Sequence, residues 1–308
     1  MQKVVVALGG NALGDSAEEQ LLNAGKAAKA IANLAEIGYK LVIVHGNGPQ
    51  VGIIKKAFDK SGSDMPIAEC TAMSQGYIGY HLQQTLQSEL NAHGLDKSVA
   101  ALLTQVVVDR NDAAFQNPTK PIGTFYDAQT AKRFMAETGH PYVEDSGRGW
   151  RWVVPSPKPV DICERDTIAA LLDSGRIVIA CGGGGIPVVT ENGTRHGADA
   201  VIDKDFAAAK LAELIEADFL FIITAVDRVS INYRKPDEKV LKCITAEEAE
   251  EYCRQGHFAP GSMLPKVEAC ISFVSSGGGR KAIIGSLESA ALALSGESGT
   301  MICTDNSK

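Results

Sequence analysis

The sequence lacks the short motifs that mark several common classes of protein. Its seven cysteines form no C-x-x-C pair, and its six histidines form no H-E-x-x-H or C-x-x-H cluster. This pattern favours reduced thiols in a cytoplasmic protein and gives no sign of a structural metal. The Walker signature G-x-x-x-x-G-K-[ST] is absent, and no G-x-G-x-x-G follows a predicted strand. These absences argue against a Walker-type NTPase and against a Rossmann dinucleotide site.

Excess positive charge and long apolar runs are also missing. Thirty Lys and Arg residues against 37 Asp and Glu residues give a net charge of -7, which argues against nucleic acid or an anionic membrane as a partner. No apolar run approaches the length of a membrane span, and the first apolar run is too short for a signal peptide. The 308 residues, 45% of them hydrophobic, suffice for one large or two modest domains.

Glycine, in contrast, is concentrated in four short stretches where strands are expected to pass into loops, at 9–10, 46–48, 182–185 and 277–279. The first three follow apolar runs at 4–8, 41–44 and 177–180, which is the pattern of strands buried on both faces. Glycine allows backbone N–H groups to crowd around an anion, and a helix that begins behind the loop adds a favourable dipole. Plain turns at strand ends are the alternative, but three such stretches in one chain predict phosphate binding.

Predicted strands and helices alternate along most of the chain. Helices are expected at 21–37, from Pro49 onward, and at 74–93, 164–173, 206–216, 246–254 and 265–274, and further strands at 99–108, 219–224 and 282–284. This order predicts an α/β fold, with an open and mostly parallel sheet between two layers of helices.

The segment 117–160 interrupts the alternation. It contains both tryptophans and six of the twelve prolines, so it does not read as a central strand. A structureless loop of this length would be unusual in a compact domain. We therefore expect a small protruding subdomain with a short helix at 128–137, of the kind that closes over substrates.

The motifs of the chain resemble those of carbamate kinases, in the amino-acid kinase superfamily. The matching stretches occur in the family's order, at 6–13, 46–52, 73–80, 117–123, 182–187, 200–205 and 261–266. The resemblance covers essentially the whole chain. It implies the amino-acid kinase fold as a single domain over 1–308, with 117–160 inserted as a lid.

Two lysines in these motifs stand apart from ordinary surface lysines. Lys204 and Lys266 lie in apolar or glycine-rich surroundings, where point charges can stabilise a phosphoryl-transfer transition state. The resemblance implies that Lys204 lies near the transferred phosphoryl group, that Lys266 contacts the nucleotide phosphates, and that Asp205 orients both. The alternative is that Asp205 or Asp203 only caps the helix that begins near Phe206.

Further site residues follow from the resemblance. Lys120, in the 117–160 segment, corresponds to a lysine that reaches the small acceptor. Phosphate and substrate contacts are expected from the glycine-rich loops, at Gly9, Gly10, Asn11, Gly46, Asn47, Gly48, Gly183, Gly184 and Gly185. Nucleotide contacts are expected from Thr224, Asp227, Tyr233 and Met263. Tyr233 is a candidate to flank the adenine, and Asp227 either contacts the ribose or caps a turn.

The resemblance implies a reversible phosphoryl transfer between ATP and carbamate, with catabolic ATP formation from ADP and carbamoyl phosphate as the expected direction, in arginine metabolism or a related pathway. Mg²⁺ is expected to arrive with the nucleotide, because no acidic cluster resembles a dedicated metal cage. A homodimer is expected from the family and from apolar residues around the predicted 74–93 helix. A sister kinase for an amino-acid carboxylate or a nucleotide monophosphate, and a catalytically idle nucleotide sensor, are the alternatives.

Overall fold

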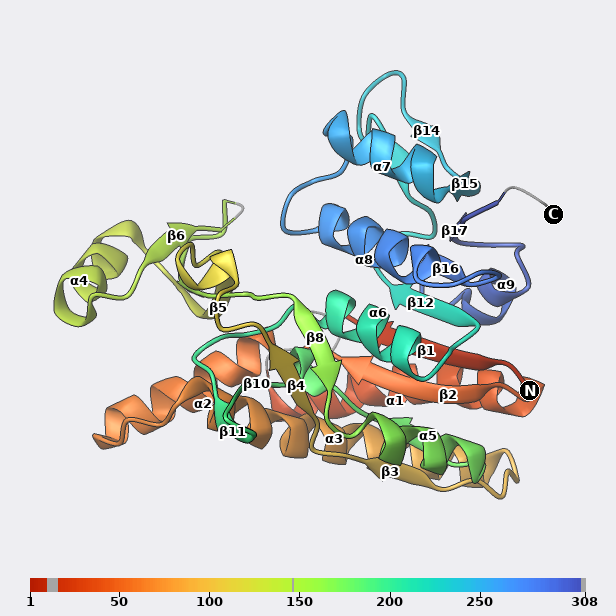
Figure 1. Ribbon diagram of the computed structural model, residues 1–308, viewed down its shortest axis with the longest axis horizontal. Coiled ribbons are helices and arrows are strands. Elements are labelled where there is room, and N and C mark those ends of the chain that lie inside the picture. The colour runs from red at the N-terminus through yellow and green to blue at the C-terminus, as the bar shows by residue number, and fades with distance from the viewer. Residues whose placement is uncertain (10–15, 146, 306–308) are drawn as a thin grey trace.

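An eight-stranded sheet forms the centre of the computed structural model, which describes residues 1–9, 16–145 and 147–305 (Figure 1). Its strand order is β15-β17-β16-β12-β1-β2-β9-β3, and every neighbouring pair is parallel except β16 and β17. The prediction of an open, mostly parallel sheet is confirmed.

The described part of the chain contains the following elements. The helices are α1 (Ala17–Ile37), α2 (Gly48–Ser61), α3 (Ile67–Ala92), α4 (Ala128–Thr138), α5 (Arg165–Asp173), α6 (Lys204–Leu214), α7 (Ala246–Arg254), α8 (Met263–Ser275) and α9 (Ala290–Leu294), with short 3-10 helices at Ala113–Phe115 and Gly182–Gly184. The large sheet consists of β1 (Lys3–Leu8), β2 (Lys40–His45), β3 (Val99–Ala101), β9 (Ile177–Ile179), β12 (Phe219–Ile223), β15 (Cys243–Thr245), β16 (Lys281–Gly285) and β17 (Thr300–Cys303). Smaller sheets contain β4 (Gln105–Val108), β8 (Pro159–Ile162), β10 (Ile186–Glu191) and β11 (Thr194–Gly197); β5 (Lys120–Tyr126), β6 (Tyr142–Glu144) and β7 (Trp150–Val154); and β13 (Ser230–Ile231) and β14 (Lys239–Val240).

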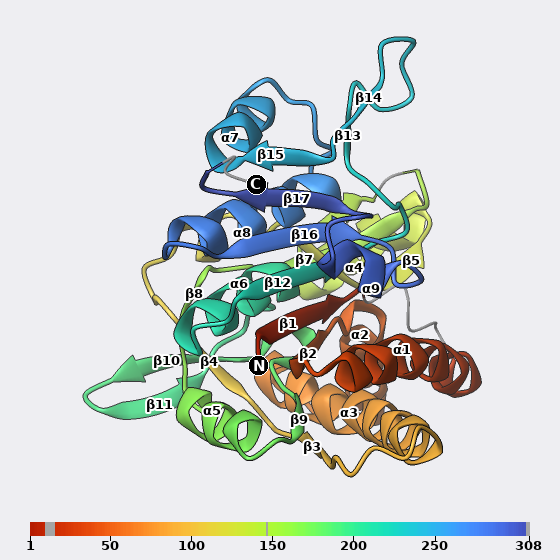
Figure 2. The same ribbon diagram turned by 90° about the vertical axis from the view of Figure 1, so that its right-hand side faces the viewer.

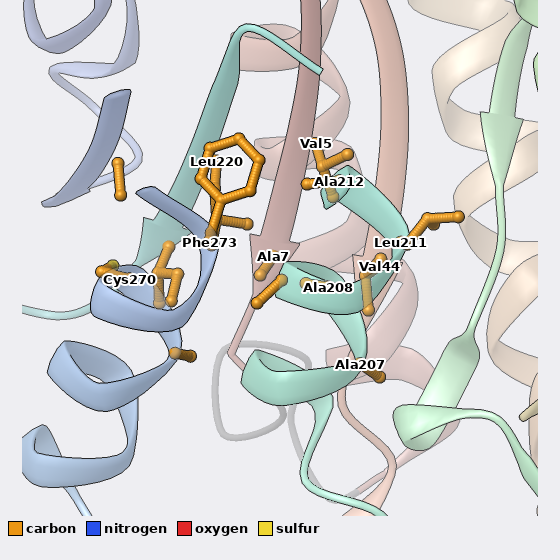
Figure 3. Close-up of a cluster of buried hydrophobic side chains, with 14 of the residues drawn as sticks. Val5, Ala7, Val44, Ala207, Ala208, Leu211, Ala212, Leu220, Cys270 and Phe273 are labelled. Atoms are coloured by element: carbon orange, nitrogen blue, oxygen red, sulfur yellow. The ribbon is translucent and has the colours of Figure 1, made fainter. Parts of the chain in front are cut away.

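Helices cover both faces of the large sheet, as predicted (Figure 2). Successive side chains of β1 enter different cores, because side chains alternate along a strand. Val4 and Val6 pack with α1, α3 and α9, whereas Val5 and Ala7 pack with α6 and α8 (Figure 3). β1 is thus buried on both faces, which explains why it reads as a continuous apolar run.

The helices that follow β1 and β12 in the chain lie on opposite faces of the large sheet. From β1 the chain continues through α1, on one face, to β2, and from β12 it continues through α7 and α8, on the other face, to β16. In open α/β sheets, ligands bind at the carboxyl ends of the two strands that flank such a reversal.

The 117–160 segment stands out to one side of the molecule (Figure 1). It contains the antiparallel sheet β5-β7-β6 and the helix α4, joined by an aromatic cluster of Tyr126, Phe134 and Tyr142. Its β5 strand lies against α2, where Gly52 and Gly123 meet so closely that a Cβ on Gly52 would overlap the Gly123 backbone.

Several boundaries differ from the sequence predictions. The strand predicted at 99–108 is two strands in different sheets, because hydrogen bonds to Thr104 hold the chain away from the large sheet between β3 and β4. The helix predicted from 74 begins seven residues earlier, as α3. No helix follows the glycines at 182–185, which lead into β10 instead, and the glycines at 277–279 follow α8 rather than a strand.

The β10-β11 hairpin was not predicted. Its turn contains Asn192 and Gly193 with φ of 49° and 80°, which is the backbone that an Asn-Gly hairpin turn requires. This dipeptide was the available signal for the hairpin.

His45, the last residue of β2, is buried at the end of the central strands. Burial lowers its pKa to about 4, and its Nδ1 lies 3.0 Å from the Gly46 carbonyl oxygen. Because that oxygen can only accept, Nδ1 donates, and the ring is neutral in the folded protein at neutral pH.

The buried ring makes stability depend on pH. Below about pH 6.5 the unfolded chain binds a proton at His45, whereas the folded chain binds it only near pH 4. The free energy of unfolding should therefore fall as pH falls through this window. Between pH 7.5 and 5 this amounts to about 2 kcal/mol. Urea unfolding at fixed protein concentration should show the loss in the wild type and in exposed His196→Gln. His45→Gln should lack that part of the loss. If the unfolding free energy of His45→Gln fell with pH as steeply as that of the wild type, the role given to His45 would be wrong.

Candidate active site

One buried carboxylate joins the N-termini of two helices. Lys204 is the first residue of α6, and its Nζ lies 2.5 Å from Asp205 Oδ1. Lys266, in the first turn of α8, places its Nζ 2.8 Å from Asp205 Oδ2. The Asp205 side chain is only 4% exposed, so both of its oxygens serve the two ammonium groups. The structure thus brings together three of the four predicted catalytic residues.

The pKa shifts reflect this sharing. Burial opposes ionisation of Asp205, but Lys204 and Lys266 more than offset it and hold the pKa of the carboxyl well below its usual range. Burial also acts against the charge on Lys266, yet Asp205 raises the pKa of this lysine. The deeper Lys204 has a lowered pKa, because burial and then repulsion from Lys266 outweigh the attraction of Asp205. Lys204 therefore gives up its proton more readily than Lys266 does.

Lys120, the fourth predicted catalytic residue, joins this cluster through Asp203, whose role the sequence left open. Lys120, the first residue of β5, places its Nζ 2.5 Å from Asp203 Oδ2. Burial opposes ionisation of Asp203, but Lys120 keeps the pKa of this carboxyl lowered. The 117–160 segment is therefore tied to the start of α6. Asp203 stands two residues before Asp205 in the motif at 200–205, and that spacing was the only signal for it.

The helix cap of α6 is Asp203 and not Asp205. Asp203 Oδ1 accepts a hydrogen bond from the Asp205 N–H at 2.9 Å, and its backbone is extended, as an N-cap residue requires. Asp205 lies inside the first turn, where its side chain faces the two lysines. The alternative of a helix cap thus applies to Asp203, which both caps α6 and contacts Lys120.

The predicted phosphate loops lie at the ends of neighbouring strands. Gly9 follows β1 directly, and the Gly46 N–H donates to the Leu8 carbonyl, so the ends of β1 and β2 are joined. Asn47 is buried, and Gly48 begins α2. Gly10 and Asn11 lie outside the described residues.

Three glycines after β9 have φ of 68°, 94° and 92° and are all buried. A Cβ on Gly183 would overlap the Asn47 side chain, one on Gly184 the Ile202 carbonyl, and one on Gly185 the Val106 side chain. Close approach to neighbouring segments therefore explains these glycines, in addition to any contact with a ligand.

The four residues predicted to contact the nucleotide come from the segment after β12 and from the start of α8. Thr224 directly follows β12, and Met263 begins α8, packed against the core. Asp227 accepts a hydrogen bond from Ser286 Oγ at 2.5 Å, so it has a structural contact of its own. Tyr233 is 53% exposed in the excursion between β13 and β14.

Two further observations concern cations and membranes. Among the described residues, no three His, Cys, Asp or Glu side chains are grouped so that they could hold a metal ion. Asp203 and Asp205 already face lysines, and this arrangement suits anionic oxygens rather than a bare cation. In the part of the chain that the structure describes, no helix combines the length and the apolar character needed to span a bilayer.

The chain is similar to known kinases over almost its whole length. It is 54% identical to a carbamate kinase of Clostridium perfringens, over 97% of this chain and 99% of the relative. It is 50% identical to a carbamate kinase-like protein of Escherichia coli, over 98% and 99% of the two chains. The solved structure of a carbamate kinase from Giardia lamblia bound to AMP-PNP matches with a TM-score of 0.89 and 44% identity, over 99% of each chain.

A family model agrees with these likenesses. The model of the amino acid kinase family matches residues 2–286, which include the central strands and all the charged residues of the cluster. The fold predicted from the sequence is thereby confirmed as the fold of this family. The chain belongs to the amino acid kinase family.

Proposed function

We propose that this chain is a carbamate kinase, an ATP-dependent kinase that catalyses the reversible reaction of carbamoyl phosphate and ADP to carbamate and ATP. The observation that carries the proposal is the cluster of three lysines held by Asp203 and Asp205 at the N-termini of α6 and α8. The near full-length similarity to carbamate kinases supports the acceptor.

The reaction needs positive charge more than it needs covalent chemistry. A terminal oxygen of the ADP β-phosphate attacks phosphorus, and the bond between phosphorus and the carbamate oxygen breaks, with its electron pair leaving on carbamate. Negative charge spreads over the transferred group and both flanking oxygens. Ammonium groups fixed in advance stabilise this charge without reorganising during the step.

Lys204 and Lys266 are suited to opposite sides of the transferred group. We assign Lys204 to the phosphoryl oxygens and Lys266 to the nucleotide phosphates and the bridging oxygen. The two helix N-termini add partial positive charge at the same place. Asp205 sets the direction of both lysines, because its two oxygens each accept from one of them.

The glycine-rich loops and the β12 end are assigned to the substrates. Gly9, Gly10, Asn11, Gly46, Asn47 and Gly48 would surround the acceptor and the transferred phosphate, with Gly183, Gly184 and Gly185 beside them. Thr224, Asp227, Tyr233 and Met263 would contact the nucleotide. Gly9, Gly46 and Thr224 follow the carboxyl ends of central strands and Met263 begins α8, which supports this division.

Mg²⁺ would enter with the nucleotide. The described residues offer no grouped metal ligands, so phosphate oxygens and water would hold the ion, and it would neutralise phosphate charge. The protein's own contribution is the lysine cluster.

Lys120 and the 117–160 segment are assigned to the acceptor. Carbamate has only four heavy atoms and cannot fix its own orientation, so a closing lid and a local charge are needed. The Lys120 contact with Asp203 places the segment's charge next to the start of α6, which supports this role. The segment would act as a lid inserted in a single domain over 1–308.

The expected setting is a small-molecule reaction in the cytoplasm, in the direction of ATP formation and within arginine metabolism or a related breakdown pathway. The acidic net charge of -7 favours neither nucleic acid nor an anionic membrane. An idle nucleotide sensor is disfavoured, because all five charged residues of the cluster are present and each of them is paired with a residue of opposite charge.

The direct test is to mix the purified protein with ADP and carbamoyl phosphate and to measure ATP. We expect rapid ATP formation. Faster phosphorylation of acetylglutamate or of a nucleoside monophosphate would instead support the sister-kinase alternative.

Lys120→Ala should raise the KM for carbamoyl phosphate and lower kcat, while calorimetry finds the Kd of ADP within about threefold of the wild-type value, because the nucleotide occupies the other half of the site.

Lys132→Ala is the matched control for this variant. Lys132 lies on α4, in the same 117–160 segment, and is exposed. It should keep the wild-type kinetics. If Lys120→Ala behaved the same way, the assignment of Lys120 to the acceptor would be wrong.

Loss of either buried lysine should slow turnover by roughly a hundredfold, as expected for one preorganised charge donor. Steady-state kinetics of Lys204→Ala and Lys266→Ala check this, with circular dichroism as the test of folding. Asp205→Asn should also be slow, because the cap of α6 is Asp203 and Asn at 205 cannot anchor two ammonium groups. Lys210→Ala, on the same helix but paired with Glu213, should retain activity. Near-normal rates in both alanine variants would refute the charge assignment.

A homodimer is the proposed assembly. Met73, Tyr77 and Tyr80 follow one line on α3, and Met73 and Tyr80 are 39% and 57% exposed. Light scattering at micromolar protein should give twice the chain mass of 32.6 kDa. Tyr80→Arg should shift the mass toward the monomer, whereas Leu292→Arg, at an exposed position on α9, should not. A wild-type mass near that of one chain would count against the dimer.

A further inference from the structure

The motif at 73–80 contains buried polar side chains for which the proposed reaction gives no role. Ser74 is fully buried and Gln75 is 4% exposed, although the other buried residues further along α3 are mostly apolar. A buried amide is costly unless its hydrogen bonds are made. The partners of these two side chains therefore indicate what the motif does.

Gln75 connects α3 to two backbone segments. Its Oε1 accepts from the Thr104 N–H at 2.9 Å, and its Nε2 donates to the Gly182 carbonyl at 2.9 Å and to the Thr104 carbonyl at 3.2 Å. All the polar atoms of the amide are used. Gln75 therefore fixes the break between β3 and β4 and the start of the 182–185 loop together.

Thr104 extends this connection around the loop. Its Oγ1 accepts from the Cys181 N–H at 3.0 Å, and its carbonyl accepts from the Ile186 N–H at 2.8 Å. The 182–185 loop is thus tied to Thr104 on both sides, and Thr104 is tied to Gln75. Cys181 itself has φ of 50°, a backbone conformation that a residue with a Cβ keeps only when its surroundings hold it there.

Ser74 holds the other glycine loop. The Asn47 amide donates to Ser74 Oγ at 2.8 Å, and Ser74 Oγ donates to the Thr71 carbonyl at 2.7 Å. The same Asn47 side chain fills the space beside Gly183. Two consecutive residues of α3 therefore set the 46–48 loop and the 182–185 loop against each other.

We infer that Gln75, supported by Ser74, is a positioning residue for phosphoryl transfer, which fixes the spacing of the two glycine loops without touching the substrates. The inference rests on the proposed function for its kinetic consequence, but its structural consequence can be measured without it. A displacement of about 1 Å in a loop that orients a reacting group can cost roughly a hundredfold in rate.

The chain contains a matched control for Gln75 on the same helix. The Gln87 amide also both accepts from and donates to the backbone, here near the edge of the sheet. Its Oε1 accepts from the Val99 N–H at 3.1 Å, and its Nε2 donates to the Lys97 carbonyl at 3.0 Å. It lies twelve residues further along α3, away from both glycine loops. Gln87→Ala removes the same chemistry without touching the loops.

The experiment compares Gln75→Ala, the near-isosteric Gln75→Glu, Ser74→Ala and Gln87→Ala. Hydrogen exchange followed by mass spectrometry should show faster exchange across 181–187 in both Gln75 variants and not in Gln87→Ala. In the assay with ADP and carbamoyl phosphate, the Gln75 variants should lose roughly a hundredfold in kcat. Gln87→Ala should keep the wild-type kcat even where thermal unfolding shows a similar loss of stability.

Gln75→Glu distinguishes positioning from simple destabilisation. It keeps an acceptor for the Thr104 N–H but turns a carboxylate oxygen toward the Thr104 and Gly182 carbonyls, so it should not rescue the rate. Ser74→Ala tests the other loop independently, should the Gln75 variants fail to fold, and should also lower kcat.

The outcomes separate the inference from the proposed function. If the wild type made no ATP from carbamoyl phosphate, the proposed function would fail, and the exchange measurement would still decide the role of Gln75. If Gln75→Ala and Ser74→Ala matched Gln87→Ala in both kcat and loop exchange, the positioning role would be refuted.

Discussion

The sharing of the Asp205 carboxylate between two ammonium groups is the constraint on which the site depends. Lys204 and Lys266 would repel each other and resist burial if they stood alone. Asp205 lets two helices present their N-termini and their lysines at one place. Three ammonium groups against two carboxylates leave a single net positive charge in the cluster, before the helix termini are counted. The cluster therefore attracts phosphates, and its net charge stays small when no phosphate is bound.

The small side chains of α6 make this arrangement possible. Ala207, Ala208 and Ala212 are fully buried against the central strands, so the helix lies close to β1 and β2 (Figure 3). A close helix brings its first turn to the carboxyl end of the sheet. The same apolar packing buries Asp205, and burial in turn makes its contacts with the lysines stronger than they would be in water.

Much of this structure could be predicted from the sequence, and the failures have physical causes. Strands buried on both faces, such as β1, read as continuous apolar runs, and the order of strands and helices fixed the architecture. The prediction of one strand at 99–108 was wrong because apolar residues stand on both sides of Thr104 and Gln105, whereas the hydrogen-bond partners of the chain change at Thr104. The cluster residues Lys120, Lys204, Asp205 and Lys266 came from motifs. The sequence suggested only a helix cap for Asp203 and no role for Ser74 or Gln75. The groups that Asp203 and Gln75 contact lie 83 and 107 residues away along the chain, and no local pattern reveals partners at such distances.

The distances along the chain between these partners bear on how the protein folds. Lys266 meets Asp205 across 61 residues, and Gln75 meets Gly182 across 107. Contacts of this range carry a loop-closure cost that must be met before they stabilise anything, so folds rich in them form slowly. Because the charged cluster takes its residues from β5, from the start of α6 and from α8, no short contiguous part of the chain contains it. Affinity for nucleotide should therefore emerge late in folding, together with the last strands of the large sheet, and a bound nucleotide would select the fully assembled molecule over every partly folded one.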